Sequence, residues 1–472
     1  MTSPRAALFL SVALAGFGGG TAARAQTLQE ALAQAYANNP TLQTARAQLR
    51  VVDENVPQAL SGWRPSVVVT AAPGYADARS RAQAINPEGE SISAYRNLDR
   101  QTLNLSGTVT QPLYRGGRTV ASTRRAENQV LAQRARLLAT EQQVLQDTVN
   151  AYVGLIRYQE EVRLNINNVQ VLQRQLDATN ERFRVGEITR TDVAQAESRI
   201  AGARATRADA EGQLQQARAT FLRTTGIAPE RLTAPQPLRL PVRSAQDAAQ
   251  LAAINNPNVV AALFDEAAGR DFIDVQQSTL LPQASLQAQA FRSDNSTVRG
   301  TRGTGESITA TLSVPLYQGG GEHSQVRQAR QDANRLRQIV DDQRRVAVQQ
   351  AVAAWEVAQS NRAQVDSTRS QIRAAEVALD GVQREAVVGS RTTLDVLNAE
   401  QELLNARVTL VRALANVVTT SHAVAAAVGR LTARDLALPV QLYDMGQYYR
   451  EVRNRWVGLG DYSTPTATAT TP

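Results

Sequence analysis

The side chains that could perform acid–base or metal chemistry are few in this 472-residue chain, and they do not cluster. There is no Cys, which excludes thiolate nucleophiles, disulfides and thiolate–metal sites. The two histidines, His323 and His422, lie far apart in the sequence and have no partner at ligand spacing. We therefore expect no metal site, no catalytic role for either histidine and no cofactor.

A second candidate for chemistry is the glycine-rich stretch GTRGTGES, residues 300–307. Glycines hold phosphates where they follow a strand and open a helix, and this stretch has no such context. We interpret these glycines as loop residues of a β-hairpin. Since no nucleophile, base and metal come together in the sequence, an enzyme is the least favoured class.

The basic charge of the chain does not predict nucleic-acid binding. The formal net charge is +8, and all 51 basic residues are Arg. They alternate with Glu and Asp along helical patterns and form no single basic patch. Nucleic acid is therefore not an expected partner.

Two carboxylates occupy matching positions after two short links in the chain. Asp192 follows the link RVGEITRTD, and Asp395 follows VVGSRTTLD. Each falls in the predicted first turn of a helix, where unpaired N–H groups and the helix dipole stabilise a negative charge by about 0.3–1 kcal/mol. The elements on either side of these links must therefore position both carboxylates.

Those elements belong to a chain that is duplicated over its length. The motif PLYRGGR (Pro112–Arg118) returns as PLYQGGG (Pro315–Gly321), 203 residues later. The same offset relates several further pairs: Gly186 and Gly389, Asp192 and Asp395, Glu197 and Glu400, and Gly226 and Gly429. The first copy has 14 extra residues between Pro65 and Pro112. Because insertions are tolerated at loop tips, we expect a longer hairpin loop there.

Each copy contains an alternating apolar and polar segment that predicts a β-hairpin. Residues 102–113 and 307–316 alternate with period two, and their partner strands begin after Pro65 and Pro282. Four strands of about ten residues result, long enough to cross a bilayer when tilted. Four strands cannot close a barrel, and an open edge cannot lie in lipid. If these strands span a membrane, several chains must pool them; two hairpins of a soluble sheet remain the alternative.

Long helices follow both hairpins. Residues 117–184 and 320–387 each run for 68 positions without Pro, which corresponds to about 100 Å of α-helix. Their apolar residues repeat every seven positions, for example Leu155, Val162, Val169, Leu176 and Phe183. A sustained seven-residue period predicts coiled-coil packing. At each of the two short links the chain then reverses direction and continues as a helix antiparallel to the long one.

The N-terminus has the pattern of an export signal. Arg5 precedes the apolar run 6–17, and Ala23-Arg24-Ala25 matches a cleavage site before Gln26. We find no later apolar run of about 18 residues, since Val417–Val428 is interrupted by Thr, Ser and His. Membrane entry is therefore predicted to use strands.

These patterns predict seven segments. They are a signal peptide (1–25), a first repeat (26–226, with hairpin about 66–114, long helix about 117–184 and return helix about 190–226), a linker (227–243), a second repeat (244–429, with hairpin about 283–317, long helix about 320–387 and return helix about 392–429), an equatorial C-terminal segment (430–462) and a disordered tail (463–472).

The chain resembles the TolC-type outer-membrane efflux proteins. The resemblance rests on LSVPLYQGG (Leu312–Gly320), on VGSRTTLDVLNAEQELLNAR (Val388–Arg407) and on the duplication, and it covers nearly the whole mature chain. It implies a mainly α fold with transmembrane β structure. Four strands per protomer would join in a homotrimeric, 12-stranded outer-membrane barrel, continued by a periplasmic α-helical barrel.

The resemblance also implies a function and partners. The protein would be a passive exit duct for drugs, small molecules or secreted proteins, embedded in outer-membrane lipid. A periplasmic adaptor and an inner-membrane pump of RND or ABC type would dock at the helical tips. The tip residues that match are Val185, Gly186, Val388 and Gly389.

Finally, the resemblance implies a periplasmic gate at the two reversals. An Asp and a Thr of the first reversal bond an Arg of the second in the family, and the matching positions are Asp192, Thr191 and Arg391. Capping and gating both remain open for Asp192. A pair of Asp residues rings the narrowest point of the family's pore, and here Asp395 matches one of them while Asn398 replaces the other.

The gate departs from the family pattern at one further position, where a Tyr that helps to hold the first Asp is replaced by Ala386. The rival class is a periplasmic coiled-coil adaptor or scaffold that never enters the membrane. Such a protein would share the heptads and the export signal, but it would not need the paired alternating hairpins.

Overall fold

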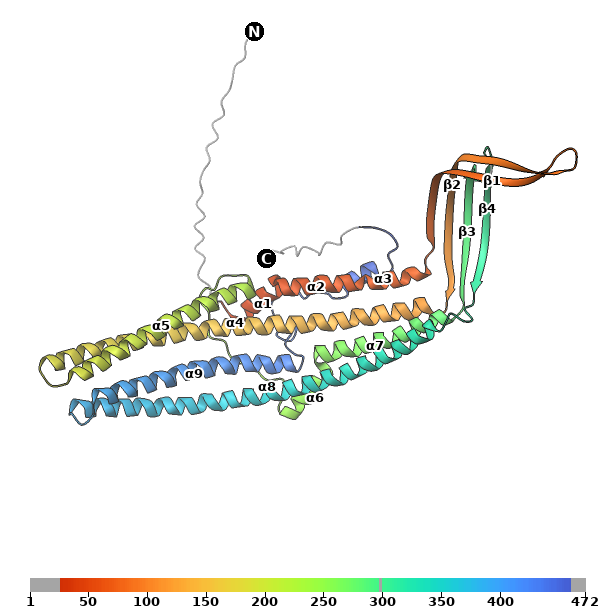
Figure 1. Cartoon of the computed structure of the whole chain (residues 1–472). Helices are drawn as coiled ribbons and strands as arrows, with labels where there is room; N and C mark the ends of the chain where they lie inside the picture. The colour runs from red at the N-terminus through yellow and green to blue at the C-terminus, as the bar shows by residue number, and fades with distance from the viewer. Residues whose placement is uncertain (1–25, 297–298, 460–472) are drawn as a thin grey trace, which may run out of the picture. The chain divides into compact units, whose positions relative to one another are not determined.

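The computed structural model describes residues 26–296 and 299–459 (Figure 1). The predicted signal peptide, residues 1–25, and the predicted tail, residues 463–472, lie outside these residues. The first half contains α1 (Leu28–Asn38), α2 (Pro40–Asp53), α3 (Asn55–Leu60), η1 (Ser61–Trp63), β1 (Ser66–Ile85), β2 (Ser91–Arg115), α4 (Arg118–Arg184) and α5 (Arg190–Thr225). The second contains α6 (Ala245–Asn255), α7 (Pro257–Gln277), η2 (Ser278–Leu280), β3 (Gln283–Asp294), β4 (Arg302–Ser313), α8 (Gly321–Val387) and α9 (Thr393–Ala427), followed by α10 (Gln447–Val452).

The duplication extends to the way in which the helices begin. Both α2 and α7 begin with Pro after a capping Asn, where the missing N–H of Pro costs nothing. The Asn39 side chain accepts a hydrogen bond from the Thr41 N–H at 2.9 Å, and Asn256 accepts one from the Asn258 N–H at 3.0 Å. The repeated Asn-Asn-Pro sequence is therefore a helix start used twice.

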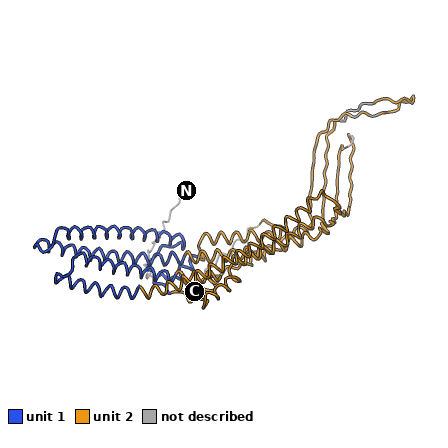
Figure 2. The backbone as a smooth tube through the Cα atoms, turned by 60° about the horizontal axis from the view of Figure 1, so that its bottom comes forward, with its two compact units in different colours: residues 1–35, 148–236, 368–418 blue, residues 36–147, 237–367, 419–472 orange. Residues whose placement is uncertain are grey.

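The chain forms two compact units (Figure 2). Unit 1 consists of residues 1–35, 148–236 and 368–418, and unit 2 of residues 36–147, 237–367 and 419–472. The sheet lies in unit 2, whereas the reversals that follow α4 and α8 lie in unit 1. Helices α4 and α8 have 67 residues each, which corresponds to about 100 Å.

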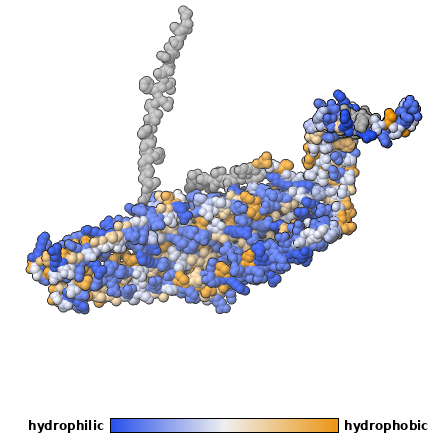
Figure 3. Space-filling model, in the orientation of Figure 1, coloured by the Kyte–Doolittle hydropathy of each residue, from blue (hydrophilic) through white to orange (hydrophobic). Residues whose placement is uncertain are grey.

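The four strands form one antiparallel sheet in the order β1-β2-β3-β4. Its register separates two faces, because directly paired residues share a face. One face is mostly apolar, with Val67, Val69, Leu103, Leu105, Val109, Leu286, Ala288, Ile308 and Leu312. The other is mostly polar, with Ser66, Thr70, Asn104, Ser106, Thr108, Thr110, Gln287, Gln289, Ser307 and Thr309. Many of the apolar residues are exposed, and Figure 3 shows hydrophobic residues on the visible flank of the strands.

The strands of the first copy are longer than the expected ten residues. β1 has 20 residues and β2 has 25, whereas β3 and β4 have 12 each. Beyond the pair Leu103–Asp294, β1 and β2 continue as a two-stranded ribbon up to the pair Ile85–Ser91. The extra residues of the first copy therefore lengthen paired strands, and the expectation of a longer loop was wrong.

We had expected the two hairpins to end at about residues 114 and 317, at the Tyr of each PLY motif, and this holds to within one residue in the first copy only. Pro112–Tyr114 lies inside β2, but β4 ends at Ser313, before Pro315. β2 has a neighbour on each side, while β4 pairs only with β3, whose first residue Gln283 faces Ser313. The backbone beyond Ser313 therefore has no strand to pair with.

The glycine-rich stretch also differs from its prediction as a loop. Gly303 and Gly305 lie inside β4, and only Gly300, with φ +86°, belongs to the turn. A Cβ on Gly305 would lie 2.8 Å from ring atoms of Phe291 on the paired strand. Gly305 thus makes room for an aromatic ring that covers the glycine backbone.

Small residues form the helical seam in unit 2. Ala347, Ala351 and Ala358 of α8 are buried at spacings of four and seven, and they pack with Val424 and Val428 at and after the end of α9. Alanine allows close approach of the helices without a large core, which agrees with the low aromatic content of 4%.

By length and composition alone, α9 could cross a membrane, contrary to our expectation that no later segment could. A third of its most apolar window is buried in the structure. Leu397, near its start, packs with Leu172 and Ile200, and Val424, near its end, packs with Val242. Its apolar residues therefore serve helix packing at both ends.

The C-terminal segment is fastened to α2, α3 and α4 within unit 2. The Tyr448 hydroxyl donates to Glu54 at 2.7 Å, and Arg453 pairs with Glu127 at 2.9 Å. Tyr449 packs against a buried cluster of Val56, Ala126 and Val130. Polar and apolar contacts thus hold α10 in place.

A buried carboxyl lies beside this segment at the end of α2. Asp53 is fully buried, and neither of its oxygens accepts a hydrogen bond from the described residues. Burial raises the pKa of Asp53 to about 6, against the opposing attraction of Arg134. Because the folded pKa exceeds the unfolded one, the charged carboxylate destabilises the fold above about pH 6, and protonation relieves this cost as the pH falls.

We predict that Asp53→Asn stabilises unit 2 at pH 7.5 by on the order of 1–3 kcal/mol, and by much less at pH 4.5, where Asp53 is already protonated. Thermal unfolding followed by circular dichroism at both pH values measures this. Asp177→Asn, at an exposed position of α4, is the control and should change little. A lower unfolding temperature for Asp53→Asn at pH 7.5 would show that the attraction to Arg134 outweighs burial.

Candidate functional site

The two helical reversals of unit 1 share one backbone design. Gly186 and Gly389 take φ values of +78° and +80°, which L-residues with a side chain rarely adopt. After α4, the Glu187 N–H donates to the Arg182 carbonyl and the Gly186 N–H to the Phe183 carbonyl. The Ser390 and Gly389 N–H groups donate to the Glu385 and Ala386 carbonyls in the same pattern. Both reversals therefore close the preceding helix with a Schellman motif.

The next helix also starts in the same way at both reversals. Asp192 Oδ2 accepts from the Thr189 N–H at 3.0 Å and from the Thr189 hydroxyl at 2.7 Å. Asp395 Oδ2 accepts from the Thr392 N–H at 3.0 Å and from its hydroxyl at 2.8 Å. These are capping boxes, so both carboxylates act as helix caps within the chain.

The caps keep both carboxylates charged. Hydrogen bonds from the Thr189 hydroxyl and N–H hold the pKa of Asp192 below its usual range. Hydrogen bonds from the Thr392 N–H and hydroxyl do the same for the pKa of Asp395, and the Arg391 charge adds to the effect. Each reversal therefore presents a stable negative charge near a helix start.

The bond between the two reversals that the resemblance implied is not formed within the chain. Arg391 does not reach Asp192; it pairs with Glu385 of its own reversal at 2.8 Å. In the first reversal, Arg182 pairs with Glu187 at 2.7 Å. Thr191 is exposed in the first turn of α5. Arg182 and Arg391 thus each form an ion pair within their own reversal.

The two return helices do meet at the other predicted gate position. Asn398 of α9 accepts a hydrogen bond from Arg199 of α5 at 2.7 Å. The adjacent Leu397 is 2% exposed and packs into the first coil against Leu172, Ile200 and Ala203. Neither Arg199 nor Leu397 was predicted from the sequence, because a heptad pattern describes packing inside one coil and not between two.

A second contact joins the two repeats further along unit 1. Arg412 of α9 pairs with Glu161 of α4 at 2.9 Å, and the side chain of Glu161 is only 5% exposed. The Arg412 side chain is 57% exposed, so solvent screens this pair and its contribution to stability is modest. The two coils are therefore joined at two levels.

Each coil is also tied internally by an equivalent arginine. Arg204 of α5 donates to Gln173 of α4 at 2.9 Å, and Arg407 of α9 donates to Glu376 of α8 at 2.9 Å. The acceptor is neutral in the first copy and charged in the second. The duplication thus preserves the contact while changing its electrostatic strength.

The links between the helices expose apolar side chains. Val185 and Val388 are 79% and 78% exposed, beside Gly186 and Gly389. Single exposed valines are common on protein surfaces and do not by themselves indicate a partner. These are the four tip residues that the sequence assigned to adaptor contacts.

The histidines do not form a reactive group with other residues. His422 is buried beside Ser421, whereas His323 is exposed at the start of α8. Among the described residues, no three His, Asp or Glu side chains are arranged to hold a metal ion.

Comparison with known proteins agrees with this geometry. The family model for "Outer membrane efflux protein" matches residues 31–226 and 248–430. The chain is 34% identical to the outer membrane efflux protein BepC of Brucella suis over 93% of both chains. It is 24% identical to the outer membrane protein TolC of Escherichia coli, over 91% of this chain and 87% of TolC. The fold matches the CmeC outer membrane channel of Campylobacter jejuni with a TM-score of 0.73 at 16% identity, covering 90% of this chain and 89% of CmeC.

We predict that Leu397→Ala loosens the contact between the two coils by about 2–5 kcal/mol, because it leaves a cavity among Leu172, Ile200 and Ala203. Hydrogen–deuterium exchange of the first turns of α5 and α9 should then become faster. The matched control is Leu394→Ala, one turn earlier at a side chain that is 37% exposed. Equal exchange in the two variants would mean that Leu397 does not hold the coils together.

Proposed function

Because this chain belongs to the outer membrane efflux protein family, we propose that it is the exit duct through which an inner-membrane pump expels cargo across the outer membrane. Its relatives include efflux proteins and a protein named for alkaline protease secretion, AprF of Pseudomonas aeruginosa. Drugs, other small molecules and secreted proteins are the cargo classes. The duct conducts passively, and the pump supplies the energy.

The sheet is the observation that carries this function. Where all four strands pair, residues alternate between an apolar and a polar face, and the exposed apolar face includes Val67, Val69, Ile308 and Leu312. Lipid would contact this face, and the polar face would line an aqueous lumen. A soluble sheet would instead cover its apolar face with protein.

The edges of the sheet support a homotrimer. Within residues 26–296 and 299–459, β1 and β4 each pair on one side only, so both present unpaired N–H and C=O groups there. A barrel needs about eight strands to close around filled space, and more to enclose a channel. Three chains would contribute twelve strands and pair β4 of each copy with β1 of the next.

We predict that Ile308→Arg prevents assembly, because a charge on the lipid face costs about 2–4 kcal/mol near the bilayer centre. The matched control is Thr309→Arg, the next residue on the same strand, whose side chain would point into the lumen. The amount of trimer extracted from outer membranes measures both variants, and only Ile308→Arg should reduce it. Equal loss in both variants would contradict the assignment of the two faces.

The helical tips are proposed as the docking surface for a periplasmic adaptor. The links at Val185-Gly186 and Val388-Gly389 occupy equivalent positions of the two repeats and expose their valines. An adaptor contacting both links would meet two similar surfaces per chain. An inner-membrane pump of RND or ABC type would complete the assembly.

The same end of the molecule is proposed as the gate. Asp395 would contribute one carboxylate per chain to a ring around the pore, and Asp192, Thr191 and Arg391 would lie beside it. In the closed arrangement, Asn398 would keep the bond that it accepts from Arg199 in the structure. Opening would separate α9 from α5 and break both this bond and the packing of Leu397.

We predict that Asp395→Asn lowers the cation-to-anion permeability ratio by a factor of about two or more, since three converging negative charges attract cations. Asn retains a side-chain oxygen for the Thr392 cap, so the helix start survives. Reversal potentials in planar bilayers measure the ratio. Asp209→Asn, at an exposed position in the middle of α5, is the control. Unchanged selectivity in Asp395→Asn would remove this residue from the pore.

A further inference from the structure

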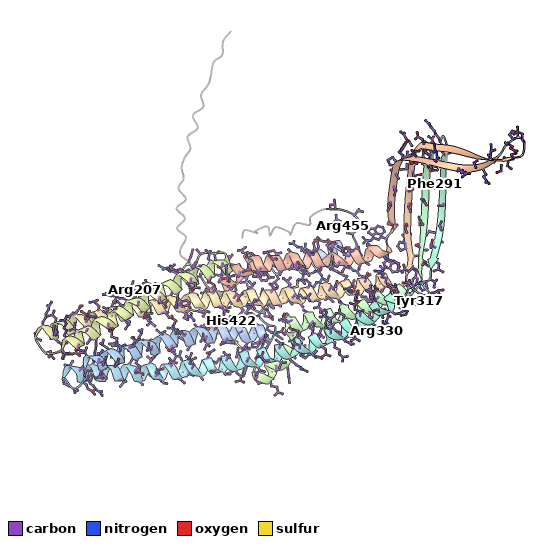
Figure 4. All side chains as sticks on the ribbon, viewed as in Figure 1. Arg207, Phe291, Tyr317, Arg330, His422 and Arg455 are labelled. Atoms are coloured by element: carbon purple, nitrogen blue, oxygen red, sulfur yellow. The ribbon has the colours of Figure 1, made fainter. Side chains whose placement is uncertain are left out.

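A basic groove of about 460 Å³ lies between η2 and the first turns of α8. One wall carries His323, Arg327 and Arg330, whose spacing of four and then three residues places them on one face of α8. Leu280 and Leu281 form part of the other wall. In Figure 4, Arg330 is labelled near the sheet end of α8, and Tyr317 at the foot of the strands.

The positive charge of this groove is not balanced by the chain. No carboxylate lines the groove, and none of its three basic side chains forms an ion pair with a residue in the described part of the chain. By contrast, Arg335, on the same helix, pairs with Asp332 at 2.8 Å. Cations gathered without a counter-ion favour an anionic ligand.

The groove adjoins the end of the membrane-facing sheet. Leu281 is two residues before Gln283, the first residue of β3, so the two lie within about 7 Å of each other along the chain. In the link between β4 and α8, the side chains of Leu316 and Tyr317 are 92% and 83% exposed. Exposed aromatic and aliphatic residues beside arginine are typical of the level where lipid headgroups meet water.

The groove combines the two chemistries that a phospholipid offers. Its basic wall suits a phosphate group, which arginine binds through paired N–H donors. Leu280, Leu281 and Val326 suit the first methylenes of an acyl chain. A free phosphate would use only the basic wall, and an acidic protein segment would have no use for an apolar wall at the end of a lipid-facing sheet.

We propose that this groove binds the headgroup of an anionic phospholipid from the periplasmic leaflet of the outer membrane. Arg327 and Arg330 hold the phosphate, His323 contacts the glycerol or phosphate oxygens, and the apolar wall receives the start of an acyl chain. This proposal rests on the location of the protein in the outer membrane. It does not depend on which cargo the duct conducts or on how the periplasmic end opens. The site fixes the depth at which the strands enter the lipid.

The test is native mass spectrometry of the detergent-solubilised full-length protein, titrated with phosphatidylglycerol or with zwitterionic phosphatidylcholine of the same acyl chains. We expect saturable binding of phosphatidylglycerol, with weaker binding of phosphatidylcholine. The double variant Arg327→Gln/Arg330→Gln should bind phosphatidylglycerol with an affinity at least about tenfold lower than that of the parent. The control is Arg337→Gln/Arg345→Gln, which removes the same charge from exposed positions further along α8 and should bind as the parent does.

Four results would overturn the site. Equal affinity for the two lipids would show that the negative charge of phosphatidylglycerol does not contribute to binding. Equal loss in the two double variants would show that the overall charge of the protein, and not this groove, explains binding. Displacement of phosphatidylglycerol by millimolar inorganic phosphate would show a simple anion site. The same spectra report the number of chains per particle, so a loss of trimer in Arg327→Gln/Arg330→Gln alone would mean that a neighbouring copy occupies the groove.

Discussion

A backbone N–H or C=O group without a hydrogen-bond partner costs several kcal/mol inside a bilayer, and the sheet of this protein has two edges full of such groups. Four strands cannot remove these edges by curling on themselves. If the sheet spans the bilayer, as proposed, its missing partners must come from other copies of the chain. The internal duplication reduces the number of copies that are needed, because it doubles the strands and the helices that each copy contributes.

The sequence predicted most of this architecture because its patterns are long. A seven-residue period sustained over α4 and α8 defines coiled helices, and the repeated link with Gly186 and Gly389 defines their ends. The strands were predicted less well. The length of β1 and β2 depends on their pairing with each other, and the early end of β4 depends on β3 starting at Gln283. Pairing of this kind is a property of two segments, and the alternation in one segment does not determine it.

At the candidate gate, too, the sequence predicted local contacts of single side chains but not contacts between distant segments. Asp192 and Asp395 were located correctly in the first turn of their helices, because capping is a local interaction between residues three apart. The contacts of Arg199 and Leu397 join residues about 200 positions apart and leave no periodic trace. Arg391, in turn, pairs with Glu385, which lies closer to it along the chain than any residue of the other reversal. Arg391 thus forms its ion pair with a residue that is close in the sequence and not with one from the other reversal.

Capping and gating can be served by the same carboxylate. Three carboxylates converging on an axis would raise one another's pKa, because each negative charge disfavours the next. At Asp395, the N–H and hydroxyl of Thr392 act in the opposite direction and hold the pKa low. These bonds engage only Oδ2, so neither of them uses Oδ1. A cap of this kind would keep a ring of like charges ionised at neutral pH, so the local role of Asp395 is compatible with the role proposed for it in the pore.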